Sequence, residues 1–469
     1  MKKVEKTLIF ADRAGSGYFV SDPIYSQFKI DEPFSDILET KEFQRLKDIT
    51  QTGFSFYDFP YLQYEDRFGH SLGAFYIMER ILDKLSKLLD GTGISISKDE
   101  KDIALAAILL HDIGHGPFSH SFEIISNYSH EKRTTDILLG DTEVHSVLVK
   151  NFGENKTRKI ASFIAEIDAS GSELEFEETN FTRLIKSLIS HQIDADRLDY
   201  LVRDSFYAEI ETAINVDKII DSIDLFLNEN GEYEVIVNKK NLTLIETPLI
   251  ERFQHYRDLY FTTSSIVGDR IFRSVLLEIR KSNEKYVLNK VTPEFRKLVF
   301  NAENLKLDEF LALTDYVVLE NLSIIKDFTE NVALKKMCDI PNCIESYFIF
   351  EDMFAKNDLK TMLCKITGLD ESELDFDDSI YEIYSKTKFY KKDEGFKIKA
   401  RSSIVDLTDV TNLVNAKDYV EVKCTAFSME IFYHQNHIGR KSGISEKEFT
   451  KKVKTEVKLL LKKNQETIS

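Results

Sequence analysis

The sequence predicts a mostly α-helical protein with small β-hairpins and a mixed α+β C-terminal region. Three observations carry this prediction. Residues 70–90 place apolar side chains at the spacing of a buried helix face. The chain has only 7 Pro and 18 Gly in 469 residues, which disfavours long unstructured linkers. Residues 396–432 contain short stretches that alternate apolar and polar side chains, as strands do.

The individual elements can be predicted in chain order. Turn residues and short apolar stretches predict a β element over 7–30 with a turn at Ala14–Gly17, and a hairpin turn at Asn230–Gly231. Apolar periodicity predicts helices over 36–52, 70–90, 103–110, 181–203 and 214–228 and a helix from Thr247. An exposed acidic loop is predicted over 168–180, and a basic, solvated helix over 447–463.

Composition narrows the class of protein. The net charge of −18 disfavours nucleic acid or an anionic membrane surface as the main partner. The four cysteines show no CxxC pairing, which indicates reduced thiols. No apolar run approaches the ~18 residues of a membrane span, and the N-terminus does not read as a secretory signal. We therefore expect a cytoplasmic protein with no membrane partner.

The strongest chemical signal is the stretch His111–His120, HDIGHGPFSH. On its own it could be a helix end with polar residues in a tight turn. However, His70 opens a long helix upstream and Asp196 lies on another downstream. With His111 and Asp112 they form two imidazoles and two carboxylates from three predicted helices. This donor set suits one first-row divalent ion and leaves two octahedral positions open.

Further histidines follow the predicted metal ligands closely. His115 is four residues after His111, and His120 and Glu123 are spaced so that the carboxylate can hold the imidazole. Together with His130 they suggest acid–base groups and phosphate donors, although each histidine alone would read as capped or solvent-facing. Arg67, three residues before His70, is a candidate phosphate contact.

The wider pattern resembles the HD-domain deoxynucleoside triphosphate triphosphohydrolases. The resemblance covers roughly the first 260 residues and rests on Phe43-Gln44-Arg45-Leu46, Gln51-Thr52-Gly53, Asp66-Arg67-Phe68-Gly69-His70-Ser71-Leu72-Gly73, HDIGHGPFSH, Ser129-His130-Glu131 and the run from Ile193 to Asp204. It implies an N-terminal β element over 1–35, an HD-domain helical catalytic core over 36–280, and a C-terminal helical or α+β region over 281–469 for oligomerisation or regulation.

The resemblance also implies an activity and a set of contacts. The activity is metal-dependent hydrolysis of deoxynucleoside triphosphates (dNTPs) to a deoxynucleoside and tripolyphosphate, with one divalent ion (Mn, Fe, Ni, Co, Zn or Mg) in each site and additional Mg²⁺ carried by the nucleotide. A dimer or tetramer is expected. The implied substrate contacts are Gln51 and Thr52 at the sugar, Tyr200 and Asp204 at its 3′ side, Arg197 and Arg252 at the phosphates, and Tyr260 packing on the substrate.

Three alternatives remain at this stage. Thr262-Thr263 stands where relatives carry His, and some a Lys just after; this favours a phosphohydrolase of another nucleotide or phosphoester. A nucleotide-sensing module that binds without turnover is a second reading, and the complete ligand set counts against it. A nucleic-acid binder is third, and the charge of −18 counts against it. Arg203 could contact phosphate or pair with Asp199.

Overall fold

A computed structural model describes residues 10–14, 16–165, 179–190, 193–282, 284–351, 356–376, 379–388, 390, 396–400, 403–411, 413 and 419–468. Nearly all of the predicted acidic loop over 168–180 lies outside these residues. The chain divides into two compact units, and neither is a continuous stretch of sequence. The first unit consists of Met1–Leu259, Lys306–Asp315 and Lys388–Val420, and the second of Tyr260–Leu305, Tyr316–Thr387 and Glu421–Ser469.

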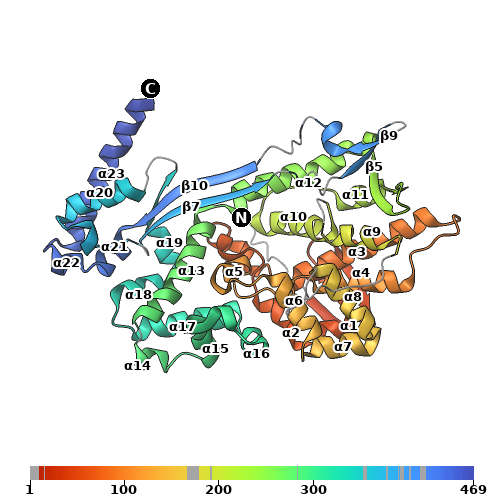
Figure 1. Ribbon diagram of the computed structural model, residues 1–469, viewed down its shortest axis with the longest axis horizontal. Helices are drawn as coiled ribbons and strands as arrows, with labels where there is room; N and C mark the ends of the chain where they lie inside the picture. The colour runs from red at the N-terminus through yellow and green to blue at the C-terminus, as the bar shows by residue number, and fades with distance from the viewer. Residues whose placement is uncertain are drawn as a thin grey trace. The chain divides into compact units, whose positions relative to one another are not determined.

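The first unit is built around α3 (Arg67–Leu89), which packs against α4 (Lys98–Leu110) and α10 (Ala195–Ala208) (Figure 1). Asp66 caps α3 by accepting the Gly69 N–H at 2.7 Å. A capping box between Ser97 and Glu100 starts α4, whose residues from Asp102 onward are all buried. These caps fix where the helices begin, and burial of their apolar faces holds them together.

Smaller helices surround this core. They are α1 (Phe34–Leu38), α2 (Lys41–Gln44), α5 (His120–Ser126), α6 (His130–Leu139), α7 (Glu143–Phe152), α8 (Glu154–Ile164), α9 (Thr182–Ile189), α11 (Val216–Ser222), α12 (Leu242–His255) and α16 (Leu307–Leu311), with 3₁₀ turns at Arg45–Asp48, Gly53–Tyr57, Pro60–Tyr64, Lys239–Asn241 and Leu407–Asp409.

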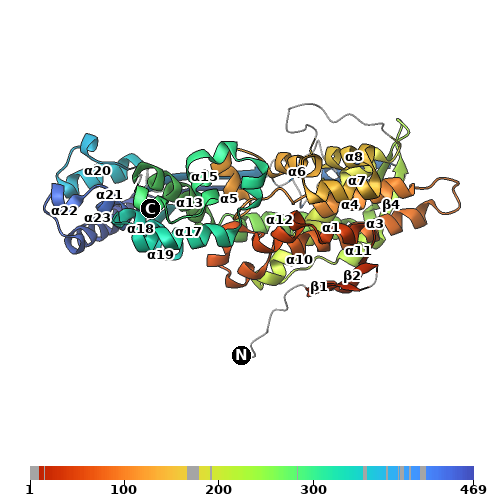
Figure 2. The same cartoon turned by 90° about the horizontal axis from the view of Figure 1, so that it is seen from below.

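Two sheets complete the first unit. The antiparallel strands β1 (Phe10–Ala14), β2 (Gly17–Asp22) and β3 (Ser26–Asp31) form the expected N-terminal β element (Figure 2). A second sheet has the order β4 (Ile223–Leu227), β5 (Tyr233–Asn238), β8 (Lys397–Ala400), β9 (Ser403–Asp406). The β4–β5 hairpin confirms the predicted turn at Asn230–Gly231, where Gly231 adopts φ 77°. The parallel β5–β8 pairing brings in a segment from far along the chain.

The second unit is also mainly helical. It contains a π-helical turn (Tyr256–Tyr260) at its border, α13 (Thr263–Ser282), α14 (Lys285–Leu288), α15 (Pro293–Asn301), a 3₁₀ turn (Ala302–Asn304), α17 (Asp315–Phe328), α18 (Val332–Met337), α19 (Ile340–Glu345), α20 (Lys356–Thr367), a 3₁₀ turn (Glu371–Glu373), α21 (Met429–Gln435), α22 (Ile438–Lys441) and α23 (Glu446–Ile468), and a sheet with the order β6 (Tyr347–Glu351), β10 (Tyr419–Ser428), β7 (Ile380–Lys388).

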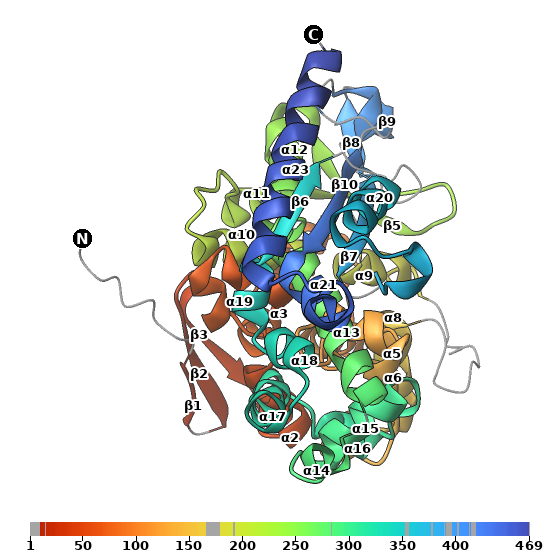
Figure 3. The same ribbon diagram turned by 90° about the vertical axis from the view of Figure 1, so that its left-hand side faces the viewer.

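Aromatic packing holds the C-terminal part of the second unit together. Helices α20, α21 and α23 pack on one another (Figure 3), and Phe427, Phe432 and Phe449 are fully buried in their shared core. The predicted basic helix over 447–463 is confirmed as α23, and the alternation over 396–432 is confirmed as β8, β9 and β10 up to Ser428. The predicted fold class, mostly α with small sheets and a mixed C-terminal region, is therefore confirmed.

Three predicted helices are corrected in detail. The 36–52 stretch is broken into short helical turns, because Thr40 caps a new start and Thr50 forms a β-bridge with Asp66. The 181–203 stretch is α9 followed by α10, because Asp194 caps a second helix through the Arg197 N–H at 2.7 Å. The 214–228 stretch leaves helical geometry at Ile223 and pairs as β4.

Among the residues that the structure describes, none of the helices combines the length and the apolar character that crossing a membrane requires.

Candidate active site

Four side chains from three elements converge at one point of the first unit. His70 lies in the first turn of α3, His111 and Asp112 follow the end of α4, and Asp196 is the second residue of α10. His70 Nε2 lies 3.3 Å from His111 Nε2 and 3.0 Å from Asp196 Oδ1. His111 Nε2 lies 3.4 Å from Asp196 Oδ1, and both imidazoles are 3.5 Å from an Asp112 oxygen. The four predicted ligands are thus brought together.

These separations suit a single divalent ion. Two donor atoms that are each about 2.1 Å from one ion lie about 3.0–3.4 Å apart in octahedral or tetrahedral geometry. The other ring nitrogens are already engaged: His70 Nδ1 lies 2.8 Å from Asp199 Oδ2, and His111 Nδ1 lies 2.7 Å from the Ile108 carbonyl. Both imidazoles therefore turn an Nε2 lone pair toward the same point, the arrangement that orients metal-binding histidines in proteins.

The charge around this point also favours a cation. Burial lowers the pKa of His70, but hydrogen bonds to Asp196 and Asp199 and the charge of Asp112 together raise it to about 10. Asp112 and Asp196 raise the pKa of His111 against the effect of burial. Anionic surroundings that stabilise a proton on these imidazoles would stabilise a divalent ion in its place.

Arg67 supports Asp112 from the side. Its three guanidinium nitrogens donate to Asp112 Oδ2 at 2.5 Å, Ser119 Oγ at 2.9 Å and the Gln51 carbonyl at 2.9 Å. Arg67 is buried, and its charge works against the effect of burial to hold the pKa of Asp112 well below its usual range. The structure thus gives Arg67 a role in orienting Asp112, a predicted metal ligand, and a contact to phosphate stays a prediction.

A strained turn leads from the metal ligands to the histidine cluster. Phe118 and Ser119 adopt φ 59° and 55°, which L-residues rarely do. Asp315 holds the turn by accepting the Phe118 N–H at 2.7 Å, and it also accepts the Thr50 N–H at 2.9 Å. Backbone strain of this kind persists only where surrounding contacts enforce it, and here it sets the start of α5 and the direction of His120.

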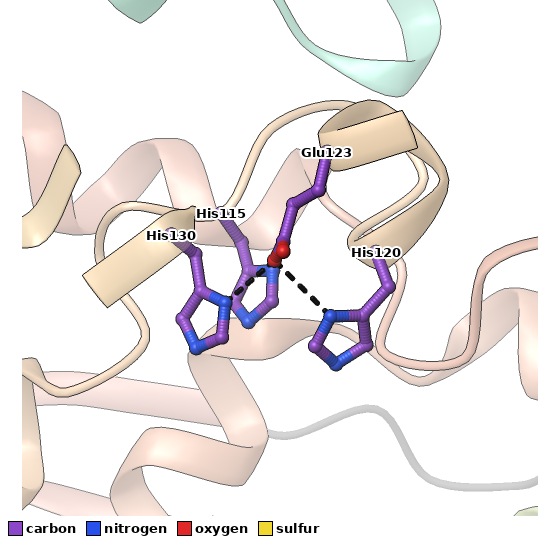
Figure 4. Close-up of side chains that lie close together, drawn as sticks. All are labelled: His115, His120, Glu123 and His130. Carbon is purple, nitrogen blue, oxygen red and sulfur yellow. Dashed lines mark hydrogen bonds and ion pairs between the residues drawn. The ribbon is translucent and has the colours of Figure 1, made fainter. Parts of the chain in front are cut away.

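The predicted acid–base residues form one cluster, which Figure 4 shows converging on Glu123. Glu123 Oε1 lies 3.1 Å from His120 Nδ1 and 2.6 Å from His130 Nδ1. The His115 and His130 rings stack with centroids 3.9 Å apart. Although burial raises the pKa of Glu123, hydrogen bonds from His120 and His130 bring it well below its usual value. One carboxylate therefore positions two imidazoles, and the His120 side chain is 70% exposed and accessible to a ligand.

His115 links this cluster to the metal ligands. Its Nε2 lies 3.3 Å from Asp112 Oδ1, and its ring faces His130. Burial, the positive charge of Arg67 and that of His130 lower the pKa of His115 well below its usual value. His115 is therefore a neutral imidazole beside the Asp112 carboxylate. Together with the ligand His70, this makes a continuous line of imidazoles and carboxylates from α10 to α6.

The other predicted substrate contacts mostly line the first unit near α10. Tyr200 lies one turn after Asp196, with its ring centroid 6.5 Å from that of His70, and Arg252 is close enough to affect its pKa. Gln51 Oε1, Thr52 Oγ1 and Arg197 Nη1 are among the buried side-chain atoms that have no hydrogen-bond partner within the described part of the chain. Buried polar atoms are normally satisfied, so these three atoms are candidates for contacts with a ligand. Tyr260 is the first residue of the second unit, and its contact with substrate stays a prediction.

Several residues of the site were not singled out from the sequence. Asp199 orients His70 while also pairing with Arg203 Nε at 2.8 Å, and Arg203 is fully buried between Asp199 and Asp22. Of the two roles that the sequence allowed for Arg203, the structure shows the ion pair with Asp199. The sequence contains one signal for Asp199: it lies three residues after Asp196, so both side chains share a helix face. Ser119 and Asp315 gave no signal, because their contacts depend on segments far apart in sequence.

Comparison with known proteins agrees with this geometry. The HD-domain profile matches residues 67–221. The chain is 32% identical over 359 residues to the Bacillus subtilis protein YwfO, covering 75% of this chain and 77% of that protein. It is 24% identical over 349 residues to the deoxynucleoside triphosphate triphosphohydrolase SAMHD1 homolog of Dictyostelium discoideum, covering 67% of this chain and 65% of that protein. Its fold is similar to the crystal structure of a phosphohydrolase from Bacteroides thetaiotaomicron, with a TM-score of 0.71 and 24% identity over 88% of this chain and 99% of that one.

Fold, relatives and candidate site together indicate a metal-dependent hydrolase with a helical core that carries its predicted ligands on three helix ends. The chain belongs to the HD-domain phosphohydrolase family.

Proposed function

We propose that the protein hydrolyses deoxynucleoside triphosphates at the α-phosphorus, giving a deoxynucleoside and tripolyphosphate. The observation that carries this proposal is the arrangement of α10. Asp196, Tyr200 and Asp204 follow one another at four-residue spacing on this single continuous helix, so a metal ligand, a phenol and a carboxylate share one face. A phosphate at the metal would therefore place its sugar beside Tyr200 and Asp204.

Each group then has a task in the proposed reaction. A divalent ion held by His70, His111, Asp112 and Asp196 would supply Lewis-acid stabilisation of the phosphate. Arg197 and Arg252 neutralise phosphate charge, and Gln51 and Thr52 border the sugar. His120 or His130, positioned by Glu123, gives a proton to the 5′ oxygen as it leaves, and His115 supports them as a neutral neighbour.

The proposal includes the assembly and the conditions of the reaction. We expect a cytoplasmic dimer or tetramer, a metal from the series Mn, Fe, Ni, Co, Zn or Mg, and additional Mg²⁺ with the nucleotide. The proposed division into an N-terminal β element (1–35), a catalytic core (36–280) and an oligomerising or regulatory region (281–469) belongs to the same hypothesis. The similarity to the Dictyostelium triphosphohydrolase supports the substrate class.

One experiment tests the activity directly. The purified protein is incubated with each dNTP and each ribonucleotide in the presence of Mg²⁺, Mn²⁺, Co²⁺ or Ni²⁺, and the products are identified by mass. Tripolyphosphate and a deoxynucleoside are expected. Release of monophosphate or pyrophosphate, or turnover of a simple phosphodiester alone, would replace the proposal with hydrolysis of another phosphoester, the alternative that Thr262-Thr263 favours.

The phosphate side of the site has its own test. Arg252→Ala should raise KM or lower kcat for a triphosphate more than for a chromogenic phosphodiester, because only the triphosphate extends to that arginine. Steady-state kinetics with both substrates decide this. Equal losses for the two substrates would assign Arg252 to folding or to the metal centre.

A further inference from the structure

The second strand of the N-terminal β element ends on a buried carboxylate. Asp22 is the last residue of β2, and its side chain is fully buried. Its Oδ1 accepts the Ile24 N–H at 2.7 Å and the Tyr25 N–H at 2.9 Å, which shapes the turn into β3. Its other oxygen, Oδ2, accepts from Nη2 of Arg203 at 2.9 Å. One carboxylate therefore builds a local turn and also bonds a side chain 181 residues away in sequence.

Arg203 extends this contact to His70, a predicted metal ligand. The Arg203 Nε donates to Asp199 Oδ2 at 2.8 Å. The two protons of Nη2 are divided between Asp199 Oδ1 at 3.0 Å and Asp22 Oδ2. The same Asp199 Oδ2 lies 2.8 Å from His70 Nδ1. Four buried side chains thus form one continuous line of hydrogen bonds from β2 through α10 to α3.

Asp22 changes the charge balance along this line. A guanidinium bonded to Asp199 alone would neutralise that carboxylate and weaken its hold on the Nδ1 proton of His70. A second carboxylate on Arg203 offsets this effect, because the two aspartates and the arginine together retain one net negative charge. Charges act strongly on their neighbours in a buried environment. Asp22 therefore supports both the orientation of the His70 ring and the electron density at its Nε2.

Aromatic contacts hold the β element against the helices of the line. The Tyr25 ring lies over the Arg203 guanidinium, whose Cζ is 5.7 Å from the ring centroid. The rings of Tyr25 and Phe28 pack on Tyr76 of α3, with centroids 5.0 Å and 4.8 Å from the Tyr76 centroid. The turn that bears Asp22 is thus attached to α3 as well as to α10.

We propose that Asp22 is a positioning residue for the metal site: acting through Arg203, it keeps His70 oriented as a ligand and strengthens the binding of a divalent ion. This gives the N-terminal β element a part in the metal centre. The inference rests on the proposed function, because it takes His70 as a metal ligand.

The test uses the full chain loaded with Co²⁺, whose unpaired electrons displace the proton NMR signals of its ligands. With Nε2 directed to the ion, His70 and His111 each keep a proton on Nδ1, next to Asp199 and the Ile108 carbonyl respectively. Two displaced, solvent-exchangeable signals are therefore expected in wild type. Asp199→Asn identifies the His70 signal, because it alters the acceptor of that proton only. The His111 signal then serves as an internal control.

Asp22→Asn keeps the Oδ1 acceptor of the turn and removes both the charge and the acceptor for Arg203. We expect the affinity for Co²⁺ to fall about 3- to 10-fold. The His70 signal should shift and exchange faster with solvent, while the His111 signal stays unchanged. Asp31→Asn, which removes an exposed charge from β3 of the same element, is the matched control and should alter neither the affinity nor the signals.

Unchanged affinity with an unchanged His70 signal in Asp22→Asn would overturn the inference and leave the metal ligands in place. Equal changes in both histidine signals would also overturn it, because they indicate a general loosening of the fold. Absence of displaced histidine signals in wild type would refute the proposed ligands, and the inference with them. Arg203→Lys decides the matter if Asp22→Asn does not fold: an ammonium keeps the charge but lacks the planar fork that bonds both carboxylates, so the His70 signal alone should change.

Discussion

Asp112 connects the two chemical parts of the site. One of its oxygens faces His70 and accepts from Arg67, and the other lies 3.5 Å from His111 and 3.3 Å from His115. A single carboxylate thus joins the metal ligands to the histidine cluster. Substitutions at the predicted metal ligands and in the histidine cluster should nevertheless have different effects, because Asp196 belongs only to the ligand group and Glu123 only to the cluster.

At the metal, Asp196→Ala removes an anionic ligand, and both bound metal and turnover should fall by roughly 100-fold or more. Metal content by atomic emission and rate with the best dNTP measure this. Asp217→Ala, at an exposed aspartate paired with Arg80, is the control. Full metal stoichiometry and full rate in Asp196→Ala would refute the ligand assignment, and Asp112→Ala should behave like Asp196→Ala.

At the cluster, Glu123→Gln keeps the shape of the side chain and removes the charge that holds His120 and His130. We expect kcat to fall about 10- to 100-fold with bound metal unchanged. Because the pKa of Glu123 is depressed in the fold, its contribution to stability is present above the unfolded pKa of about 4.5 and is lost as pH falls below it. The variant should lack that acid sensitivity in urea titrations. Loss of metal in Glu123→Gln would contradict a separate cluster.

At the scale of elements, the contact between α3 and α10 sets the site. Gly73 on α3 faces Asp199 and Arg203 on α10 so closely that a Cβ there would collide with both side chains. The two helices can approach because this position has no side chain. Asp199 in turn orients His70, so helix packing and ligand geometry depend on the same contact.

Gly73→Ala should therefore cost about 2–4 kcal/mol of unfolding free energy, because it displaces a buried ion pair. Metal affinity should fall with it, since Asp199 no longer orients His70. Chemical denaturation and metal titration measure the two effects, and Lys87→Ala at an exposed position of the same helix is the control. A variant as stable as wild type would show that the helices adjust without moving Asp199.

The N-cap of α3 gives a prediction about pH. Burial raises the pKa of Asp66 to about 7, while the Gly69 N–H and nearby cations lower it less. The folded state therefore binds a proton that the unfolded state has lost, and wild type loses stability as pH rises from about 4 to about 7. Asn caps a helix equally well without ionising. Asp66→Asn should gain about 1–3 kcal/mol relative to wild type between pH 5 and pH 8 in urea titrations. A pH-independent difference would contradict the raised pKa.

At the scale of the whole molecule, residues with a fixed pattern could be predicted from the sequence, and residues that depend on distant segments could not. His70, His111, Asp112 and Asp196 stand in motifs whose spacing reveals them, and the structure brings His70, His111 and Asp196 into one group with Asp112 at 3.5 Å from both imidazoles. The 3₁₀ turn Pro60–Tyr64 meets α10 only through tertiary packing, and Asp315 contacts Thr50 and Phe118, which lie 265 and 197 residues away in sequence. Apolar periodicity also predicted one helix over 181–203, although the Asp194 cap ends this continuity and starts α10 as a separate helix.

The discontinuous first unit predicts how truncation behaves. A chain ending at residue 280 lacks the Leu313 carbonyl that Arg45 binds at 2.9–3.0 Å, the carboxylate of Asp315, and the strand β8 that pairs with β5. We expect it to melt without a cooperative transition and to bind little metal, measured by circular dichroism and metal titration. Cooperative melting with full metal binding would show that residues 1–280 fold and form the metal site without the later segments of the first unit.

Because the first unit is assembled from separate segments of the chain, it can close only late in synthesis. The last segment of the first unit ends at Val420, so about nine tenths of the chain must leave the ribosome before the catalytic unit can close. At typical elongation rates the segment from α10 to β8 takes on the order of ten seconds or more to appear. Until β8 has been made, the edge of β5 has no neighbour on its β8 side, and an unpaired strand edge of this kind favours aggregation.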